Sequence, residues 1–280
     1  MNAEIQALGV YRADPSLKGK LRRRLVRLAH RRPAERRPDR PMVTFAFDDT
    51  PASAVRRGAP ILEARGVRGA YYFCAGLADE DGHMGRYASC EDMQRTAEAG
   101  HEIGCHTYSH LDCGQAPAAM IADDLELNAA LLSDWGVSHS LETFAYPYGD
   151  VGFAAKQEAA QRFVLSRALH HGVIEPGVDL NQAPAIGVEG QDGEAIARLW
   201  LDKAKEKRAW VILFTHGVED AASPFGTSAD TLARLVDDAQ TMGFDVVSAA
   251  EGAARVGPAG LRSPAFGAPA LESPALRDAA

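Results

Sequence analysis

Five acidic or imidazole side chains stand just past short apolar runs of the chain, where they could perform hydrolytic chemistry. Asp48 and Asp49 follow one such run together, His106 and His216 lie just past two others, and His110 comes four residues after His106. Imidazole nitrogens and carboxylate oxygens are common ligands of Zn²⁺, and a site with two His and one carboxylate leaves a coordination position for water. The pattern therefore predicts a hydrolase that uses a divalent metal, with Zn²⁺ as the expected ion.

Each half of this pattern also has a simpler explanation. A His pair at this spacing arises by chance on solvated helices, and an Asp pair before Pro51 is common in turns. Occurring together at strand ends, they favour the metal site. The spacing of His106 and His110 then predicts two imidazoles on one side of a helical turn. Asp48 and Asp49 should point in different directions, so that one binds metal and the other accepts a proton.

The elements that must position these residues alternate along the chain. Runs rich in β-branched and aromatic residues predict strands at 42–47, 70–74, 102–105, 143–146, 163–166, 210–214 and 245–248. Helical patterns lie between them at 53–65, 90–99, 117–135, 151–161, 192–207 and 228–241. This alternation indicates a parallel sheet, either a barrel or a doubly wound sheet. The carboxyl ends of such strands form one rim, so the polar residues there, Tyr148 included, should meet.

Four segments are similar to the successive motifs of the polysaccharide deacetylases, the NodB homology group also called carbohydrate esterase family 4. The resemblance covers about residues 41–250 and implies a distorted (β/α)7 barrel with a divalent metal, usually Zn²⁺. The segments are FAFDDTP at Phe45–Pro51, GHEIGCHTYSH at Gly100–His110, FAYPYGD at Phe144–Asp150 and VILFTHG at Val211–Gly217.

The resemblance also implies roles for individual residues. Asp48 matches the catalytic base, His216 matches the general acid, and Tyr148 matches the residue whose backbone N–H helps to hold the oxyanion. The implied metal ligands are Asp49, His106 and His110.

The chain departs from the family pattern at several positions. Thr50 stands where the family usually has Gly, and Ala145 stands where an Arg often steadies the base. The segment Val178–Val188 lacks the Trp of the usual fourth motif, and Asp179 within it is the expected partner of His216. Thr50, Pro147 and Asp179 are also the expected contacts for substrate.

The expected reaction is removal of N-acetyl groups from amino-sugar units of a bacterial exopolysaccharide or its lipid-linked precursor. The FAYP variant of the third motif resembles that of exopolysaccharide-type members such as holdfast deacetylases. Two other enzymes remain open, an O-acetyl esterase and a hydrolase of small cyclic amides. A metal-binding or glycan-binding module without catalysis is the alternative outside the enzymes.

Charge and composition divide the chain into three zones. Residues 1–40 form a basic arm with a net charge of +8, residues 41–252 form the catalytic domain, and residues 253–280 form a tail rich in Pro, Ala and Gly, expected to be disordered. Everything after residue 40 carries a net charge of −16, which argues against a nucleic-acid partner.

The arm has two interpretations that the sequence does not separate. Within residues 18–37, leucines interleave with arginines as in amphipathic helices on anionic membranes. A solvated arm, or a helix packed on the acidic barrel, would look the same. With neither a signal peptide nor an apolar run long enough to span a membrane, we expect a cytoplasmic protein that acts at the inner face of the membrane if the arm binds lipid. The four cysteines should be reduced thiols.

Overall fold

The computed structural model of the chain describes residues 16–137 and 141–261. Seven parallel strands form one curled sheet in the order β7-β6-β5-β2-β1-β9-β8. In that order they are Leu165–Arg167, Thr143–Ala145, Glu102–Cys105, Ala70–Phe73, Met42–Phe47, Trp210–Thr215 and Ile186–Gly187. This arrangement confirms the predicted α/β class and its distorted (β/α)7 barrel.

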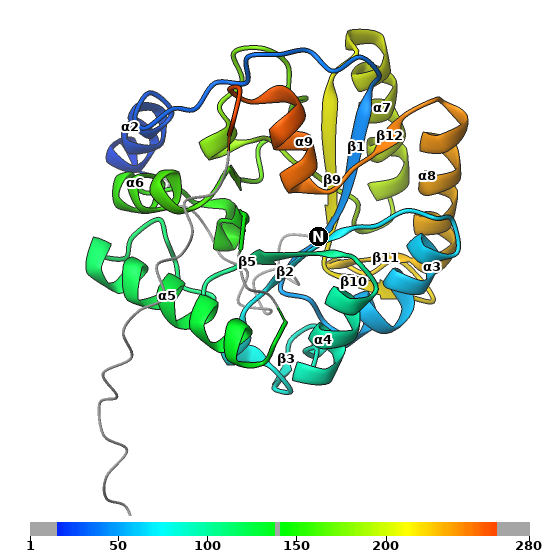
Figure 1. Cartoon of the computed structure of the whole chain (residues 1–280), viewed down its shortest axis with the longest axis horizontal. Coiled ribbons are helices and arrows are strands. Elements are labelled where there is room, and N and C mark those ends of the chain that lie inside the picture. Colours follow the sequence, from blue (N-terminus) through cyan, green and yellow to red (C-terminus); the bar gives the residue numbers. More distant parts are fainter. Residues whose placement is uncertain (1–15, 138–140, 262–280) are drawn as a thin grey trace, which may run out of the picture.

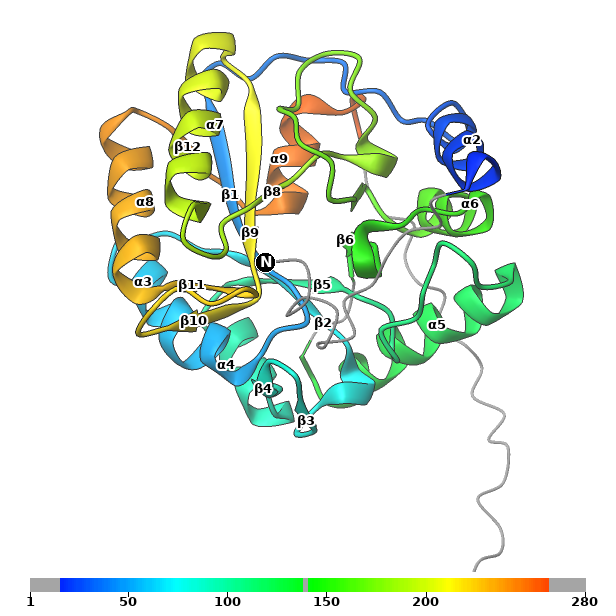
Figure 2. The same cartoon turned by 180° about the vertical axis from the view of Figure 1, so that it is seen from behind.

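Helices surround the sheet on its outer side, with α2, α5 and α6 on one flank and α3, α7 and α8 on the other (Figures 1 and 2). Most of them follow the sequence pattern to within two residues at each end. The helices are α2 Leu17–Val26, α3 Ala59–Glu63, α4 Cys90–Glu98, α5 Ala118–Asp134, α6 Phe153–Arg162, α7 Gly193–Lys207, α8 Ala229–Thr241 and α9 Ala249–Val256. Within the described residues, no helix has both the length and the apolar character needed to cross a bilayer.

Shorter elements complete the fold. A π-helical turn, η1 (Ala54–Gly58), leads into α3, and 3-10 turns form η2 (Ala75–Leu77), η3 (Pro147–Gly149) and η4 (Leu180–Gln182). Two small strand pairs project beyond the sheet, and one short strand joins β1. They are β3 (Asp81–Gly82) with β4 (Gly85–Arg86), β10 (Gly217–Glu219) with β11 (Gly226–Ser228), and β12 (Asp245–Val246).

Strand β1 lies inside the sheet, between β2 and β9. It pairs with β9 along its whole length, while its other edge is shared by β12 at Met42 and by β2 at Phe47. All six of its residues are buried, as expected for a parallel strand covered on both faces. The residues that follow Phe47 therefore emerge at the carboxyl-end rim, between the ends of β2 and β9.

The barrel is open between β7 and β8, and the N-terminal arm covers this seam. A single parallel bridge joins Arg167 to Ala183 across the gap, and Pro33 bridges to Asp179 beside it. The Arg32 guanidinium donates to carbonyl oxygens of the neighbouring α6–β7 segment, including that of Val164 at 3.0 Å. This part of the predicted arm is thus packed on the barrel.

The boundary predicted for the tail is wrong at its start. Residues 253–256 continue α9, whose N-cap is Ser248, and the Ser248 hydroxyl accepts a hydrogen bond from the backbone N–H of Glu251. Ala253 and Val256 are fully buried, so their apolar side chains contribute to the core. The rest of the expected disordered tail from residue 262, and residues 1–15 of the arm, lie outside the described residues.

Candidate metal centre and active site

The three residues expected to bind metal meet at the rim of the barrel. Asp49 Oδ1 lies 2.9 Å from His106 Nε2 and 3.0 Å from His110 Nε2. The candidate ligand atoms of the three side chains all lie within 4.8 Å of one another. Asp49 follows β1 and His106 follows β5, two strands separated only by β2, so the sheet itself brings the carboxylate to the imidazoles.

His110 reaches this position from a loop, and the expected helical turn is wrong. Thr107 and His110 both have positive φ, at 64° and 57°, which an α-helix does not allow. The Thr107 hydroxyl accepts from the backbone N–H of Leu111 at 2.9 Å, and Asp124 of α5 accepts from that of Tyr108 at 2.7 Å. These bonds hold the loop in the shape that turns the second imidazole back toward Asp49.

The polarity of this cluster fits a bound cation. His106 Nδ1 lies 2.8 Å from the carbonyl oxygen of Ala145, which can only accept, so Nδ1 must carry the proton. Burial lowers the pKa of His106 and favours its neutral form, whose other nitrogen, Nε2, then presents a lone pair. That lone pair faces a buried carboxylate oxygen at 2.9 Å, and two buried acceptors in contact are unfavourable unless a cation lies between them.

Asp49 is held in the form that a metal ligand requires. Burial by itself would raise the pKa of its carboxyl, but the contacts with the His106 and His110 imidazoles outweigh burial and bring it well below its usual value. The side chain is therefore a carboxylate throughout the neutral pH range. It offers a negative charge to the same point as the two imidazole nitrogens.

The second carboxylate of the pair, Asp48, points elsewhere, to a residue that the sequence analysis missed. It forms an ion pair with Arg167, and both side chains are buried. The guanidinium lies between the rings of Tyr72 and Phe214, 4.9 and 5.0 Å from their centroids. Burial lowers the pKa of Arg167 to about 9, so the guanidinium stays charged at neutral pH.

Arg167 explains the Ala found in the third motif. In the ladder between β6 and β7, Ala145 is the direct register partner of Arg167. A basic side chain therefore reaches the Asp48 carboxylate from the neighbouring strand. The signal was present in the sequence, because Arg167 comes directly after the strand predicted at 163–166, as Asp48 does after its own strand.

His216 also has a partner other than the expected one. Its Nδ1 contacts Glu189 Oε1, whereas Asp179 pairs with Lys156 at 2.7 Å and accepts from the backbone N–H of Arg32. Asp179 thus holds the N-terminal arm, and its assignment as partner of His216 is wrong. Glu189 stands two residues past β8, a strand of only two residues that no apolar run predicts.

The Glu189 carboxylate tunes His216. Burial would lower the pKa of the imidazole, but the hydrogen bond and charge of Glu189 outweigh it and raise the pKa above the ordinary value. The Asp49 carboxylate adds to this increase, and Arg167 opposes it. The charges of Asp49 and Arg167 therefore both act on His216, which belongs to the same site.

The remaining expected site residues divide into one at the surface and two in the interior. Tyr148 has a φ of 58° and is 42% exposed. Its ring and the His110 imidazole pack edge to face, with 4.4 Å between the ring centroids. Thr50 and Pro147 are buried, and their expected contact with substrate stays a prediction. The Thr50 hydroxyl donates to the carbonyl oxygen of Tyr72 at 3.0 Å, and its φ of 49° is one that the usual Gly adopts without strain.

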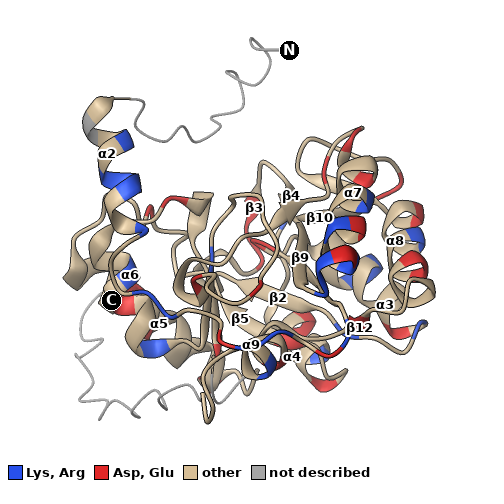
Figure 3. Cartoon of the chain, turned by 90° about the horizontal axis from the view of Figure 1, so that it is seen from above, with Lys and Arg blue, Asp and Glu red and all other residues tan. Residues whose placement is uncertain are grey.

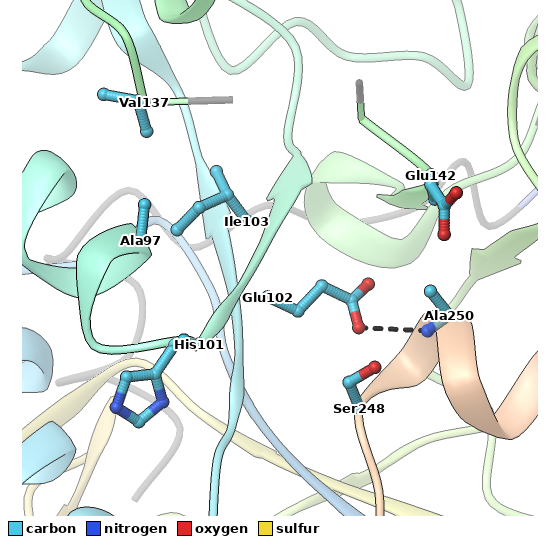
Figure 4. A pocket seen from close by; sticks show the side chains of 9 residues that line it. Ala97, His101, Glu102, Ile103, Val137, Glu142, Ser248 and Ala250 are labelled. Atoms are coloured by element: carbon cyan, nitrogen blue, oxygen red, sulfur yellow. Dashed lines mark hydrogen bonds between the residues drawn. The ribbon is translucent and has the colours of Figure 1, made fainter. Parts of the chain in front are cut away.

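A separate pocket lies at the opposite end of the barrel, around the first residue of β5 (Figure 4). Glu102 in its lining accepts from the backbone N–H of Ala250 at 3.0 Å and from the Thr143 hydroxyl. Burial raises the pKa of this carboxyl. Because its oxygens bind the first turn of α9 and the start of β6, Glu102 ties these elements together and needs no ligand.

Comparison with known proteins places this geometry in context. Residues 35–162 match the sequence profile of a family described as polysaccharide deacetylase, and no curated protein matches the chain. The T48 deacetylase with substrate is 17% identical, with a TM-score of 0.54, over 77% of this chain and 91% of that one.

Two further solved structures share the fold. A family 4 acetyl xylan esterase from Clostridium thermocellum, in complex with a cobalt ion, is 14% identical over 75% of this chain and 89% of its own, with a TM-score of 0.55. A family 4 pseudoenzyme from Bacillus anthracis is 15% identical over 77% and 66%, with a TM-score of 0.52. Identities this low establish a common barrel and leave the chemistry to be argued from the residues.

Proposed function

We propose, from the premise that this chain belongs to the polysaccharide deacetylase family, that it removes N-acetyl groups from the amino-sugar units of a bacterial exopolysaccharide or its lipid-linked precursor. The observation that carries the proposal is the convergence of Asp49 with two imidazoles, since its Oδ1 lies 2.9 Å from His106 Nε2 and 3.0 Å from His110 Nε2. The neighbouring Asp48 is held by its own ion pair with Arg167. A ligand for the metal and a carboxylate suited to accept a proton thus come from adjacent residues at the end of β1.

Asp49, His106 and His110 would hold a divalent metal, and their nitrogen and carboxylate donors suit Zn²⁺. When bound, such an ion supplies a Lewis acid that polarises the acetyl carbonyl and makes water acidic near neutral pH. The Ala145 carbonyl fixes the tautomer of His106, so that Nε2 is the nitrogen available to the ion.

Asp48 is suited to take the proton of the attacking water. Its buried ion pair with Arg167 keeps the carboxylate charged and fixes its direction. The backbone N–H of Tyr148 is the proposed donor to the oxygen of the acetyl group, where negative charge develops. One such donor contributes about 3–4 kcal/mol to the transition state.

His216 is suited to return a proton to the departing amine. Its Nδ1 is engaged by Glu189, which leaves Nε2 to face the substrate and keeps the imidazole protonated to higher pH. An amine cannot leave as an anion, so amide cleavage needs this acid more than ester cleavage does. The His216–Glu189 pair therefore favours N-deacetylation over the O-acetyl esterase alternative.

The two ion pairs also argue against a binding module without catalysis. Burying Arg167 against Asp48 is costly, and a module that only binds metal or glycan has no use for a charged acceptor beside the metal ligands. The same holds for an imidazole whose pKa is raised at the edge of the site.

Acetate release tests the proposal directly. N-acetylglucosamine oligomers and O-acetylated xylan are incubated with the protein as purified, after chelation, and after Zn²⁺ is restored. We expect acetate from the amide substrate, loss on chelation and recovery with Zn²⁺, while Asp48→Asn stays inactive throughout. Release from xylan alone would replace the proposal with an esterase, and release from neither substrate would favour a binding module.

A further inference from the structure

Four leucines of the N-terminal arm point away from the protein. Leu17, Leu21, Leu25 and Leu28 are 85%, 57%, 45% and 73% exposed. They recur at intervals of four, four and three residues, so they form one stripe along α2 and the turn that follows it. A contiguous apolar stripe on a surface marks an interaction site, whereas single exposed leucines are ordinary.

The helix cannot turn this stripe inward, because its opposite side is already fixed. Val26 is fully buried, and its carbonyl oxygen accepts from the Lys156 ammonium at 2.9 Å. Arg22 forms a 2.6 Å ion pair with Asp150, whose side chain is also buried. These anchors hold the leucines outward without a partner that the described residues supply.

Basic side chains run beside the stripe. Lys20, Arg24 and Arg27 lie on its flank, and none of them forms an ion pair with any residue that the structure describes. Further along the arm the arginines are used differently, since Arg36 donates to backbone carbonyls of the chain and Arg40 pairs with Asp245. The cations of the arm that lack an ion-pair partner among the described residues are thus concentrated on α2 and its C-cap. Figure 3 shows that α2 stands out from the rest of the molecule.

We propose that this leucine face, formed by Leu17, Leu21, Leu25 and Leu28 with Lys20, Arg24 and Arg27, docks the enzyme on an anionic phospholipid bilayer. Leucines of an interfacial helix enter the boundary between headgroups and acyl chains, while flanking cations reach the lipid phosphates. A second copy of the chain fits less well, because two such faces packed together would bring their basic side chains close to one another, and like charges repel.

The position of α2 relates this surface to the active site. Arg22 holds Asp150, the residue directly after the η3 turn that carries Tyr148. In Figure 3, α2 stands on the same side of the molecule as β3, β4 and β10, which follow the carboxyl ends of β2 and β9. Docking through the leucine face would therefore bring the rim of the barrel close to the lipid surface.

Vesicle co-sedimentation of the full chain tests the inference. The vesicles contain either phosphatidylcholine alone or equal parts of phosphatidylcholine and phosphatidylglycerol, and no substrate is present. We expect binding to the anionic vesicles only. Each basic residue near an anionic surface contributes about a factor of five, so Lys20→Glu with Arg24→Glu should weaken binding at least tenfold. The pair Leu21→Ser and Leu25→Ser should have a similar effect.

Exposed apolar residues of α5 provide the matched control. Met120 and Leu127 are 52% and 49% exposed, and the double variant Met120→Ser with Leu127→Ser should bind vesicles like the wild type. Every variant should still release acetate from soluble oligomers at the wild-type rate, which separates this inference from the proposed function. Wild-type vesicle binding by the Leu21/Leu25 variant would overturn the inference. A second result would also overturn it: a wild type that does not bind anionic vesicles but forms a dimer in solution, which the Leu21/Leu25 variant converts to a monomer.

Discussion

The buried ion pair beneath the active site gives the prediction whose size can be worked out most directly. Asp48→Asn and Arg167→Met each remove one charge, and the two together complete a double-mutant cycle. Both side chains are buried, with exposures of 4% and 0%, so water screens the pair poorly. Opposite unit charges about 4 Å apart attract by about 4 kcal/mol at an effective dielectric constant of 20.

We therefore expect a coupling of about 2–4 kcal/mol between the two substitutions in the free energy of unfolding. Urea unfolding of the four metal-free proteins measures it. Arg198 and Glu194 on α7 supply the control cycle, because their side chains are 44% and 28% exposed and such a pair contributes about 0.3–0.5 kcal/mol. If the Asp48–Arg167 coupling were no larger than this control, Arg167 could not be the group that fixes the base.

Two further predictions concern His216 and the packing beneath the rim. The Glu189 carboxylate raises the pKa of His216, and the acid must hold its proton, so Glu189→Gln should move the alkaline limb of the kcat profile to lower pH. A limb that stays in place would contradict this role. A Cβ at Gly104 would lie 2.5 Å from the Tyr72 ring, so Gly104→Ala should destabilise the protein by about 1–3 kcal/mol in urea unfolding. Gly187→Ala, with its nearest contact at 3.4 Å, should cost less than about 1 kcal/mol, and equal losses for both would refute the packing argument.

The sequence was sufficient to place the rim of the barrel because strand ends are local features. Apolar runs end at Phe47 and Cys105, and the residues that follow them, Asp49 and His106, face each other once the strands lie in one parallel sheet. Arg167 obeys the same rule, although it lies outside the four segments that resemble the family motifs.

Other features depend on contacts that no local pattern contains. The shape of the loop from His106 to His110 rests on positive φ angles and on Asp124 of a distant helix, so spacing alone suggested a helical turn. The choice of Glu189 over Asp179 depends on which loop passes beside His216. The first residues of the expected tail are helical because α9 buries them, although their composition resembles a linker.

Metal binding by the three rim residues is the central claim, and calorimetric titration of the metal-free protein with Zn²⁺ measures it most directly. We expect one equivalent per chain for the wild type and for Asp48→Asn, and loss of this binding in His110→Ala, whose imidazole is a ligand in the proposed site. Wild-type affinity in His110→Ala would contradict the account, as would a wild-type chain that binds no Zn²⁺.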